Sequence, residues 1–281
     1  ILHENEAAEI LYHISADIHM HGSDIKEGKI ELIADCDGVL KIRRDVLLAV
    51  NSLGEMMIAS RHGDFPVKKG DKIAGTRIIP LVIEKSKMDK AEKVAGTKPI
   101  FSILPYRSKK VGIITTGSEV QKGLIKDTFT PVLKEKLDEF SCQILGQTLP
   151  GDERSQITSD ILSFIDQGAD MVICSGGMSV DPDDRTPGAI KDTGAEVVTY
   201  GAPVLPGAML LLSYYQNNDK IIPILGLPGC VMYARRTVFD LILPRIMADD
   251  RICADEIASY GEGGLCLNCD VCTFPNCGFG K

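Results

Sequence analysis

The second half of the chain alternates short apolar runs with segments whose apolar residues recur at helical spacing. Between two of the runs, for example, Ile157, Ile161 and Ile165 mark one face of a helix. This alternation predicts βαβ units, and therefore an α/β fold with a three-layer, mostly parallel sheet and helices on both faces. The expected strands are 111–116, 142–149, 171–174, 197–199 and 221–225.

Several residues in this half are typical of helix ends. We expect Thr130 to be an N-cap followed by Pro131 at the first helical position, and Asp152 to open the next helix. A last helix is expected over 232–246, in which Pro244 marks a kink or an end.

Residues 1–107 follow a different pattern. A helical start around Ala7 and Leu11 precedes β-like runs at 30–34, 56–59 and 78–83, with glycines between them. The polar segment 85–98 is typical of an exposed helix or a linker, and we favour a solvated surface segment. The chain, which begins at Ile1, is expected to start inside a longer protein. We therefore expect three parts. A smaller α+β or β-rich domain with a truncated N-terminus covers 1–107, an α/β domain covers 108–250, and a cysteine-rich tail covers 251–281.

The composition is that of a globular protein. Of 281 residues, 44% are apolar and 25% charged, and no apolar run reaches the length of a membrane span. The net charge of −8 and the lack of a basic stripe argue against nucleic-acid binding. Scattered cysteines are typical of reduced thiols in a cytoplasmic protein, and they are Cys36, Cys142, Cys174, Cys230 and Cys253.

Three predicted strands run directly into loops of glycine and small hydroxyl residues, at 115–119, 175–186 and 226–229. Ligands of parallel sheets bind at the carboxyl ends of strands, so these loops are expected to form one crevice. Its glycine amides and threonine hydroxyls suit a phosphate, and the carboxylates that follow suit Mg²⁺. The alternative is a tight turn with a solvated acidic edge. The acidic residues of the second loop are Asp181, Asp183 and Asp184.

The order of these motifs closely resembles the molybdopterin-binding domain of molybdenum-cofactor biosynthesis, which molybdopterin adenylyltransferase and molybdopterin molybdotransferase share. The resemblance covers 109–249, and the tail resembles a subgroup with a cysteine-rich C-terminus. The matching motifs are Thr116-Gly117-Ser118-Glu119, Pro150-Gly151-Asp152, Ser175-Gly176-Gly177-Met178-Ser179, Asp184 with Thr186, and Leu227-Pro228-Gly229.

The resemblance implies binding of molybdopterin or Mo-molybdopterin through its phosphate, with catalytic roles for Asp152 and Asp184 on Mg²⁺. The reaction would be adenylylation with ATP or Mg²⁺-dependent molybdate insertion, in a homo-oligomer. For Asp152, capping of the following helix is an equally strong interpretation. The implied cofactor-binding residues are Thr116, Gly117, Ser118, Glu119, Ser175, Gly176, Gly177, Met178, Ser179, Asp181, Thr186, Pro228 and Gly229.

Three features depart from the family. The loop 203–209 contains no lysine, although molybdotransferases typically carry lysines there, and Cys230-Val231 replaces an Asn-Pro pair. Cys230 is interpreted as a buried thiol rather than a soft metal ligand. No segment matching the β-barrel of the molybdotransferases follows 250. The missing lysines favour the alternative of a non-catalytic carrier, chaperone or redox sensor that docks on a molybdoenzyme, whereas the retained Asp152 and Asp184 favour the enzyme.

The tail combines a flexible glycine approach, at Gly261, Gly263 and Gly264, with four closely spaced cysteines. Their C-x₂-C-x₂-C-x₄-C spacing favours a thiolate metal centre, because four free thiolates so close would repel one another. An iron–sulfur cluster is preferred and Zn²⁺ is the alternative. The expected ligands are Cys266, Cys269, Cys272 and Cys277.

Overall fold

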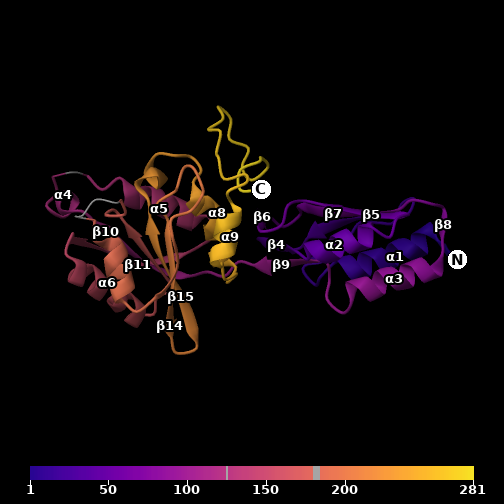
Figure 1. The fold of residues 1–281 in the computed structure, drawn as a ribbon, viewed down its shortest axis with the longest axis horizontal. Coiled ribbons are helices and arrows are strands. Elements are labelled where there is room, and N and C mark those ends of the chain that lie inside the picture. Colours follow the sequence, from indigo (N-terminus) through magenta and orange to yellow (C-terminus); the bar gives the residue numbers. More distant parts are fainter. Residues whose placement is uncertain (125, 180–183) are drawn as a thin grey trace. The chain divides into compact units, whose positions relative to one another are not determined.

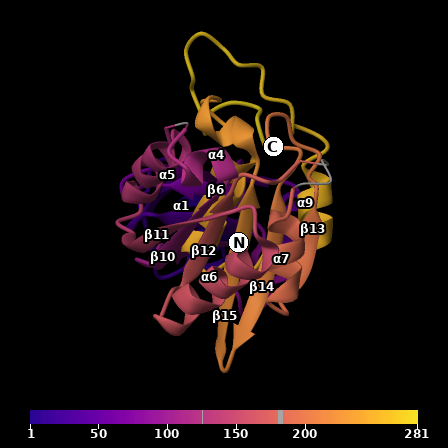
Figure 2. The same cartoon turned by 90° about the vertical axis from the view of Figure 1, so that its left-hand side faces the viewer.

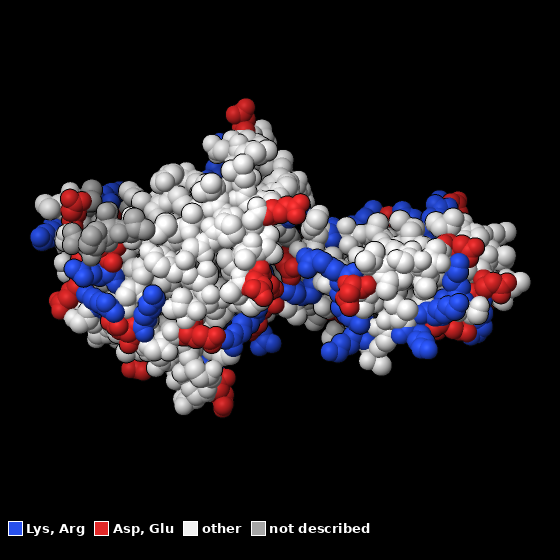
Figure 3. All heavy atoms as spheres, viewed as in Figure 1, with Lys and Arg blue, Asp and Glu red and all other residues white. Residues whose placement is uncertain are grey.

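A computed structural model describes residues 1–124, 126–179 and 184–281. The chain divides into two compact units, Ile1–Tyr106 and Arg107–Lys281, and each is described by itself. None of the helices in these described ranges combines the length and apolar content needed to cross a bilayer. In both units Lys and Arg side chains are interspersed with Asp and Glu on the face drawn in Figure 3.

The first unit is built from antiparallel sheets and three helices, which confirms the expected smaller α+β domain (Figure 1). One sheet has the order β2 (Met20–Gly22), β3 (Lys29–Ala34), β7 (Lys72–Ile78), β5 (Met56–Ser60), and a second the order β6 (Phe65–Val67), β4 (Gly38–Ile42), β9 (Phe101–Pro105). A short pair joins β1 (Leu2–His3) to β8 (Val82–Ile83). The helices are α1 (Glu4–Ser15), α2 (Arg44–Asn51) and α3 (Lys85–Ala95).

Helix α3 corrects the interpretation of 85–98 as a solvated segment. Met88, Ala91 and Ala95 are fully buried and belong to the core of the first unit, although lysines dominate the rest of the helix. Their helical spacing forms a narrow apolar stripe that a composition-based interpretation overlooks. The expected run 78–83 is also wrong as one strand, because β7 ends at Ile78 and β8 covers only Val82–Ile83.

The second unit contains a single six-stranded sheet. Its order is β11 (Gln143–Gly151), β10 (Lys110–Thr116), β12 (Met171–Ser175), β15 (Lys220–Leu227), β14 (Leu211–Asn217), β13 (Glu196–Tyr200). The first four strands are parallel, whereas β14 pairs antiparallel with both β15 and β13. The mostly parallel sheet is thus confirmed, with an antiparallel edge in which β14 was not anticipated.

Helices cover both faces of this sheet, as expected. Figure 2 shows α6 (Arg154–Asp166) and α7 (Thr186–Asp192) in front of the strands, where they bury an apolar core that includes Ile114 and Val172. On the opposite face, α5 (Phe129–Asp138) and α8 (Val238–Met247) are joined by the ion pair of Lys136 with the buried Asp240, at 2.6 Å.

Helix ends differ from the sequence expectations. α5 starts at Phe129, and Asp127 rather than Thr130 caps it, accepting the backbone N–H groups of Phe129 and Thr130 at 2.9 and 3.1 Å. α6 starts at Arg154 with Glu153 in the N-cap position, so Asp152 is not its cap. The expected helix 232–246 is a 3₁₀ turn, η1 (Gly229–Met232), followed by α8, which continues through Pro244.

Candidate functional site

The three glycine-containing loops begin at the same level of the sheet. In the parallel register Ser175, the last residue of β12, pairs with Thr115 of β10 on one side and with Leu227 of β15 on the other. Because neighbouring parallel strands end at one edge, the loops at 116–119, 176–179 and 228–229 leave the sheet side by side.

Buried hydroxyl groups connect the first loop to the second. Thr116 Oγ1 donates to the carbonyl oxygen of Ser175 at 3.1 Å and lies 3.2 Å from Thr186 Oγ1. Thr186 Oγ1 donates to the carbonyl oxygen of Gly176 at 2.9 Å. All three hydroxyl-bearing residues are buried. The loop conformation is therefore held by hydrogen bonds inside the protein.

The loop after β12 approaches the loop after β10 so closely that positions 176 and 177 have to be glycine. Their φ angles are +84° and +55°, in the left-handed region. A Cβ atom on Gly176 would lie 2.7 Å from the carbonyl oxygen of Thr116, and one on Gly177 would lie 2.8 Å from Thr186 Oγ1. Without side chains, the two glycines leave the backbone of this loop open to close approach by a ligand.

Asp152 belongs to the same edge of the sheet but has a different partner from the one expected. Its Oδ2 atom accepts the backbone N–H of Ser118 at 2.8 Å, and the preceding Gly151 pairs with Thr116. Ser118 is the first residue of the short helix α4 (Ser118–Gln121), which also contains the exposed Glu119. The carboxylate of Asp152 therefore connects the end of β11 with the loop after β10.

Asp184 lies at the second loop, half-buried, and its environment includes a residue that the sequence did not indicate. Tyr200, at the end of β13, donates its phenol hydrogen to the carbonyl oxygen of Met178 at 3.1 Å. Burial raises the pKa of Tyr200, and the negative charge of Asp184 raises it further. The only sequence signal for Tyr200 is its place at a strand end.

The remaining expected residues differ in exposure. The side chain of Met178 is buried over Gly226, whereas Ser179 and Gly229 are exposed and Pro228 is buried. Asp181 and Asp183 lie outside the described residues. Asp152 and Asp184 are on loops that flank the one at 116–119, because β10 lies between β11 and β12.

Two thiols near this edge are neutral groups. Cys174 is fully buried at the end of β12, and burial raises its pKa. Burial also raises the pKa of the Cys230 thiol, although this residue is half-buried and not fully buried as expected.

Two of the three tail glycines, Gly263 and Gly264, are needed for close packing, whereas we expected all three to supply a flexible approach. A Cβ atom on Gly263 would lie 2.0 Å from the carbonyl oxygen of Lys281, and one on Gly264 would lie 2.3 Å from that of Pro203. The tail consequently starts and ends at the same place, where Gly280 N–H donates to the Gly263 carbonyl at 2.9 Å.

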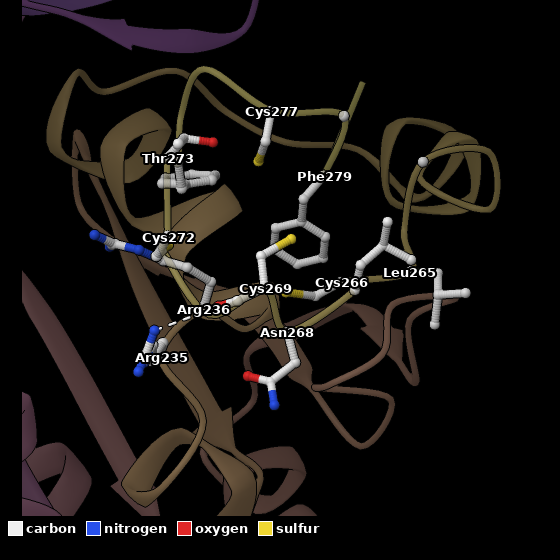
Figure 4. Close-up of a pocket in the computed structure, with 14 residues that line it drawn as sticks. Arg235, Arg236, Leu265, Cys266, Asn268, Cys269, Cys272, Thr273, Cys277 and Phe279 are labelled. Carbon is white, nitrogen blue, oxygen red and sulfur yellow. Dashed lines mark hydrogen bonds between the residues drawn. The ribbon is translucent and has the colours of Figure 1, made fainter.

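The four tail cysteines line one cavity of about 230 Å³ together with Arg235, Arg236 and the rings of Phe274 and Phe279. Figure 4 shows Cys266, Cys269 and Cys277 around the ring of Phe279, and Cys272 beside Arg236. Across 1–124, 126–179 and 184–281, no three His, Cys, Asp or Glu side chains converge as metal ligands do. The thiols thus share a cavity without forming a closed coordination set.

Two arginines that precede α8 bind the tail, which belongs to the same unit. Arg235 Nη1 donates to the carbonyl oxygen of Asp270 at 2.8 Å, and Arg236 lies over the ring of Phe274 at 4.9 Å from its centroid. The pKa of the Cys272 thiol is lowered because the backbone N–H of Phe274 donates to it and because Arg236 is close.

Comparison with known proteins places the second unit in a family. A family model described as "Probable molybdopterin binding domain" matches residues 112–248. The molybdopterin molybdenumtransferase of Synechococcus elongatus is 25% identical over 193 residues, which cover 66% of this chain and 44% of that protein. The CinA-like protein of Mycolicibacterium gilvum is 37% identical over 79 residues, covering 28% of this chain and 19% of that protein.

Among solved structures, the tungsten cofactor synthesizing protein MoaB from Pyrococcus furiosus matches 52% of this chain and 99% of its own, with 17% identity and a TM-score of 0.43. The chain spans less than half the length of the molybdenumtransferases of Synechococcus elongatus and Haemophilus influenzae, 44% and 43% respectively. Residues 112–248 of this chain belong to the molybdopterin-binding domain family of molybdenum-cofactor biosynthesis.

Proposed function

We propose that the strand-end loops bind the phosphate of molybdopterin or of Mo-molybdopterin. The observation that carries this proposal is the hydrogen-bonded arrangement of Thr116, Ser175 and Thr186 around the glycine pair, at the carboxyl edge of a parallel sheet. Such an edge is where this class of sheet binds anionic ligands, and the family of residues 112–248 supplies the ligand class.

Thr116→Val tests the phosphate site, because valine keeps the volume and removes the hydroxyl. The single hydroxyl hydrogen of Thr116 goes to the Ser175 carbonyl, so its loss removes a buried hydrogen bond that holds the loop. The affinity for molybdopterin should therefore fall about ten- to hundredfold, measured by calorimetric titration. Thr158→Val is the matched control, since that hydroxyl donates to the carbonyl oxygen of Ala189 at 3.0 Å on α6, away from the loops. Equal affinities in the two variants would remove Thr116 from the site.

Mg²⁺ would be held by Asp152 and Asp184. Both supply hard carboxylate oxygens from loops that flank the candidate phosphate site, and the hydrogen bond from Ser118 orients Asp152 while leaving Oδ1 without a protein donor in the described part of the chain. A divalent ion there neutralises charge that develops on phosphoryl oxygens. Asp152 and Asp184 are accordingly the proposed catalytic residues.

The proposed activity is either adenylylation of molybdopterin or Mg²⁺-dependent insertion of molybdate. A turnover assay with molybdopterin, ATP, Mg²⁺ and molybdate should show consumption of nucleotide or release of metallated cofactor. Asp184→Asn should reduce the rate by about a hundredfold or more if the carboxylate acts on the metal ion. An unchanged rate would exclude Asp184 from the reaction.

A carrier that docks on a molybdoenzyme is the second candidate, and one observation favours it. The lysine-free loop 203–209 is in contact with the tail, because Leu205 N–H donates to the Gly264 carbonyl and Cys266 N–H donates to the Leu205 carbonyl, both at 2.8 Å. The same assay separates the candidates. Stoichiometric cofactor binding without nucleotide consumption or metal insertion would support the carrier.

For the tail we propose a thiolate metal centre, an iron–sulfur cluster in preference to Zn²⁺. Four cysteines around one cavity are the expected donor set, although their thiols have to move to close around an ion. Metal analysis and an absorption spectrum of anaerobically purified protein test this. Iron with sulfide would support the cluster, zinc would support the structural alternative, and neither metal would contradict both.

A further inference from the structure

The tail begins with the short helix α9 (Ala254–Ser259), and the segment after it, residues 261–281, has little internal structure. Residues 261–281, all described, contain no helix or strand beyond the single bridge between Leu265 and Leu205, and Leu267 and Val271 are more than three-quarters exposed. Phe279 is the one large apolar residue of this segment that is buried. A segment with so small a core needs other attachments to hold one conformation.

Arg235 and Arg236 provide such attachments, and both come from the connection 228–237, which joins β15 to α8. Arg235 binds tail carbonyl oxygens at Cys269 and Asp270, at 3.4 and 2.8 Å, and among the described residues no carboxylate pairs with it. Arg236 stacks on Phe274. Figure 4 shows both guanidinium groups at the side of the cavity where Cys272 lies.

The charge on this side of the cavity is not balanced by carboxylates. Arg236 donates to Asp240 at 2.9 Å, but Lys136 also donates to Asp240, at 2.6 Å. Two cations therefore share one carboxylate, and Arg235 adds a further positive charge. Four thiolates around a divalent ion carry a net charge of about −2, which is opposite in sign to this surplus. The cavity is thus electrostatically suited to an anionic thiolate centre.

The same connection starts at the candidate phosphate site. It begins with Pro228-Gly229, directly after β15, and continues through η1, whose Met232 sulfur accepts a hydrogen bond from Thr128 Oγ1 at 3.4 Å. It ends at Thr237, which forms a capping box with Asp240, the carboxylate that also binds Arg236. The connection thus joins the turn after β15 to the helix end whose Asp240 binds Arg236.

We propose that Arg235 and Arg236 are the counter-charges of the tail metal centre and that they couple its occupancy to the order of the Pro228-Gly229 turn. The inference rests on the proposed thiolate centre in the tail. When the centre forms, its negative charge holds both guanidinium groups, and the connection 228–237 becomes less mobile. When the centre is absent, the partners of the two arginines in the described part of the chain are carbonyl oxygens, Asp240, the Phe274 ring and the Cys272 thiol.

The test uses the full chain, reduced and free of metal, with Co²⁺ as a probe whose thiolate charge-transfer band reports binding. The variant carries Arg235→Gln and Arg236→Gln. Arg251→Gln is the matched control, because Arg251 also has one carboxylate partner, Glu196, and one ring, Tyr214, at 5.1 Å, but does not line the tail cavity. Amide hydrogen exchange of peptides covering 226–237 and 263–281 is measured with and without Co²⁺.

The double variant should bind Co²⁺ about ten- to hundredfold more weakly, as is usual for groups that support metal ligands from outside the coordination sphere. At saturating Co²⁺ it should protect 263–281 but not 226–237, whereas the unsubstituted chain and Arg251→Gln protect both. Equal Co²⁺ affinity, or no protection of 226–237 in the unsubstituted chain, would overturn the coupling.

Failure of the tail site and failure of the phosphate site are separable. Absence of the charge-transfer band in the unsubstituted chain would overturn the metal centre together with this inference, while the calorimetric comparison of Thr116→Val with Thr158→Val would still report on the loops. Conversely, loss of molybdopterin binding leaves the exchange experiment valid, because that experiment contains no pterin.

Discussion

The strand-end loops and the cysteine tail both lie in the second unit and both depend on glycines at close contacts, yet they are held in different ways. The loops leave buried parallel strands, and hydroxyl groups of Thr116 and Thr186 fix them from inside the protein. The tail is attached by a single bridge at Leu265, by backbone hydrogen bonds at its two ends and by two arginines. The loops are therefore preorganised, whereas the tail is suited to gaining order from a bound metal.

The cysteines of the two regions show the same contrast. Cys174, directly before the second loop, is a core residue whose thiol stays protonated because burial raises its pKa. Cys272 is exposed, and the Phe274 N–H and Arg236 lower its pKa. Identical side chains are thus buried and protonated in one region, and exposed with a lowered pKa in the other.

Alkylation of the metal-free native protein should show the largest difference. Iodoacetamide should modify Cys269 and Cys272 at rates near those of free thiols, while Cys174 should react about a thousandfold more slowly, because it needs unfolding to become accessible. Time-resolved peptide mass spectrometry measures both rates. Comparable rates at Cys174 and Cys272 would show that the strand end is not the closed core that the structure describes.

Gly176→Ala should have the largest effect on stability. The new Cβ atom would lie 2.7 Å from the Thr116 carbonyl oxygen at a φ of +84°, so a loss of about 2–4 kcal/mol in the free energy of unfolding is expected. Gly194→Ala has a similar φ, +86°, with no atom within 4 Å of its Cβ position, and should lose about 1 kcal/mol. Urea unfolding measures both, and equal losses would mean that the close approach at Gly176 contributes nothing.

Asp127, which caps α5, should make the free energy of unfolding of the second unit depend on pH. Burial by itself raises the pKa of Asp127, but donors at Thr130, Gln147 and Phe129 outweigh it and leave the pKa lowered. Because the folded-state pKa lies below the unfolded value of about 3.9, this contribution is present above that pH and is lost as the pH falls through the folded-state pKa.

Asp127→Asn should therefore cost about 1 kcal/mol at neutral pH and flatten the stability profile in acid below about pH 4. Urea unfolding at pH values from about 2 to about 7 provides the measurement. Asp219→Asn, at an exposed turn between β14 and β15, is the control and should change neither value. A profile for Asp127→Asn parallel to that of the unsubstituted chain would contradict the assignment.

Gly263→Ala should have the smallest effect on global stability. Its Cβ atom would lie 2.0 Å from the Lys281 carbonyl oxygen, so the tail has to open. The free energy of unfolding of the six-stranded sheet should fall by less than about 0.5 kcal/mol, because the tail adds little to the core of that sheet. The urea midpoint should stay in place while Co²⁺ binding weakens. A large shift of the midpoint would show that the tail is part of the folding core after all.

Much of the fold was readable from the alternation of apolar runs and helical stripes, because buried parallel strands need apolar residues on both faces. The motifs after these strands also indicated the family that residues 112–248 belong to. Helix ends were harder to predict from the sequence. Asp152 stands where an N-cap of α6 would stand, but its carboxylate accepts the backbone N–H of Ser118 at the start of α4, a partner that local sequence does not reveal.

The sequence by itself determined the α/β class, the glycine and hydroxyl content of the loops and the cysteine spacing of the tail, because these follow from local periodicity and residue chemistry. Only the tertiary structure decided that Ser175 is in register with Thr115 and Leu227, that Tyr200 reaches the second loop, and that two arginines face the tail cavity. These relations join residues far apart in the chain, and strand order and packing bring them together.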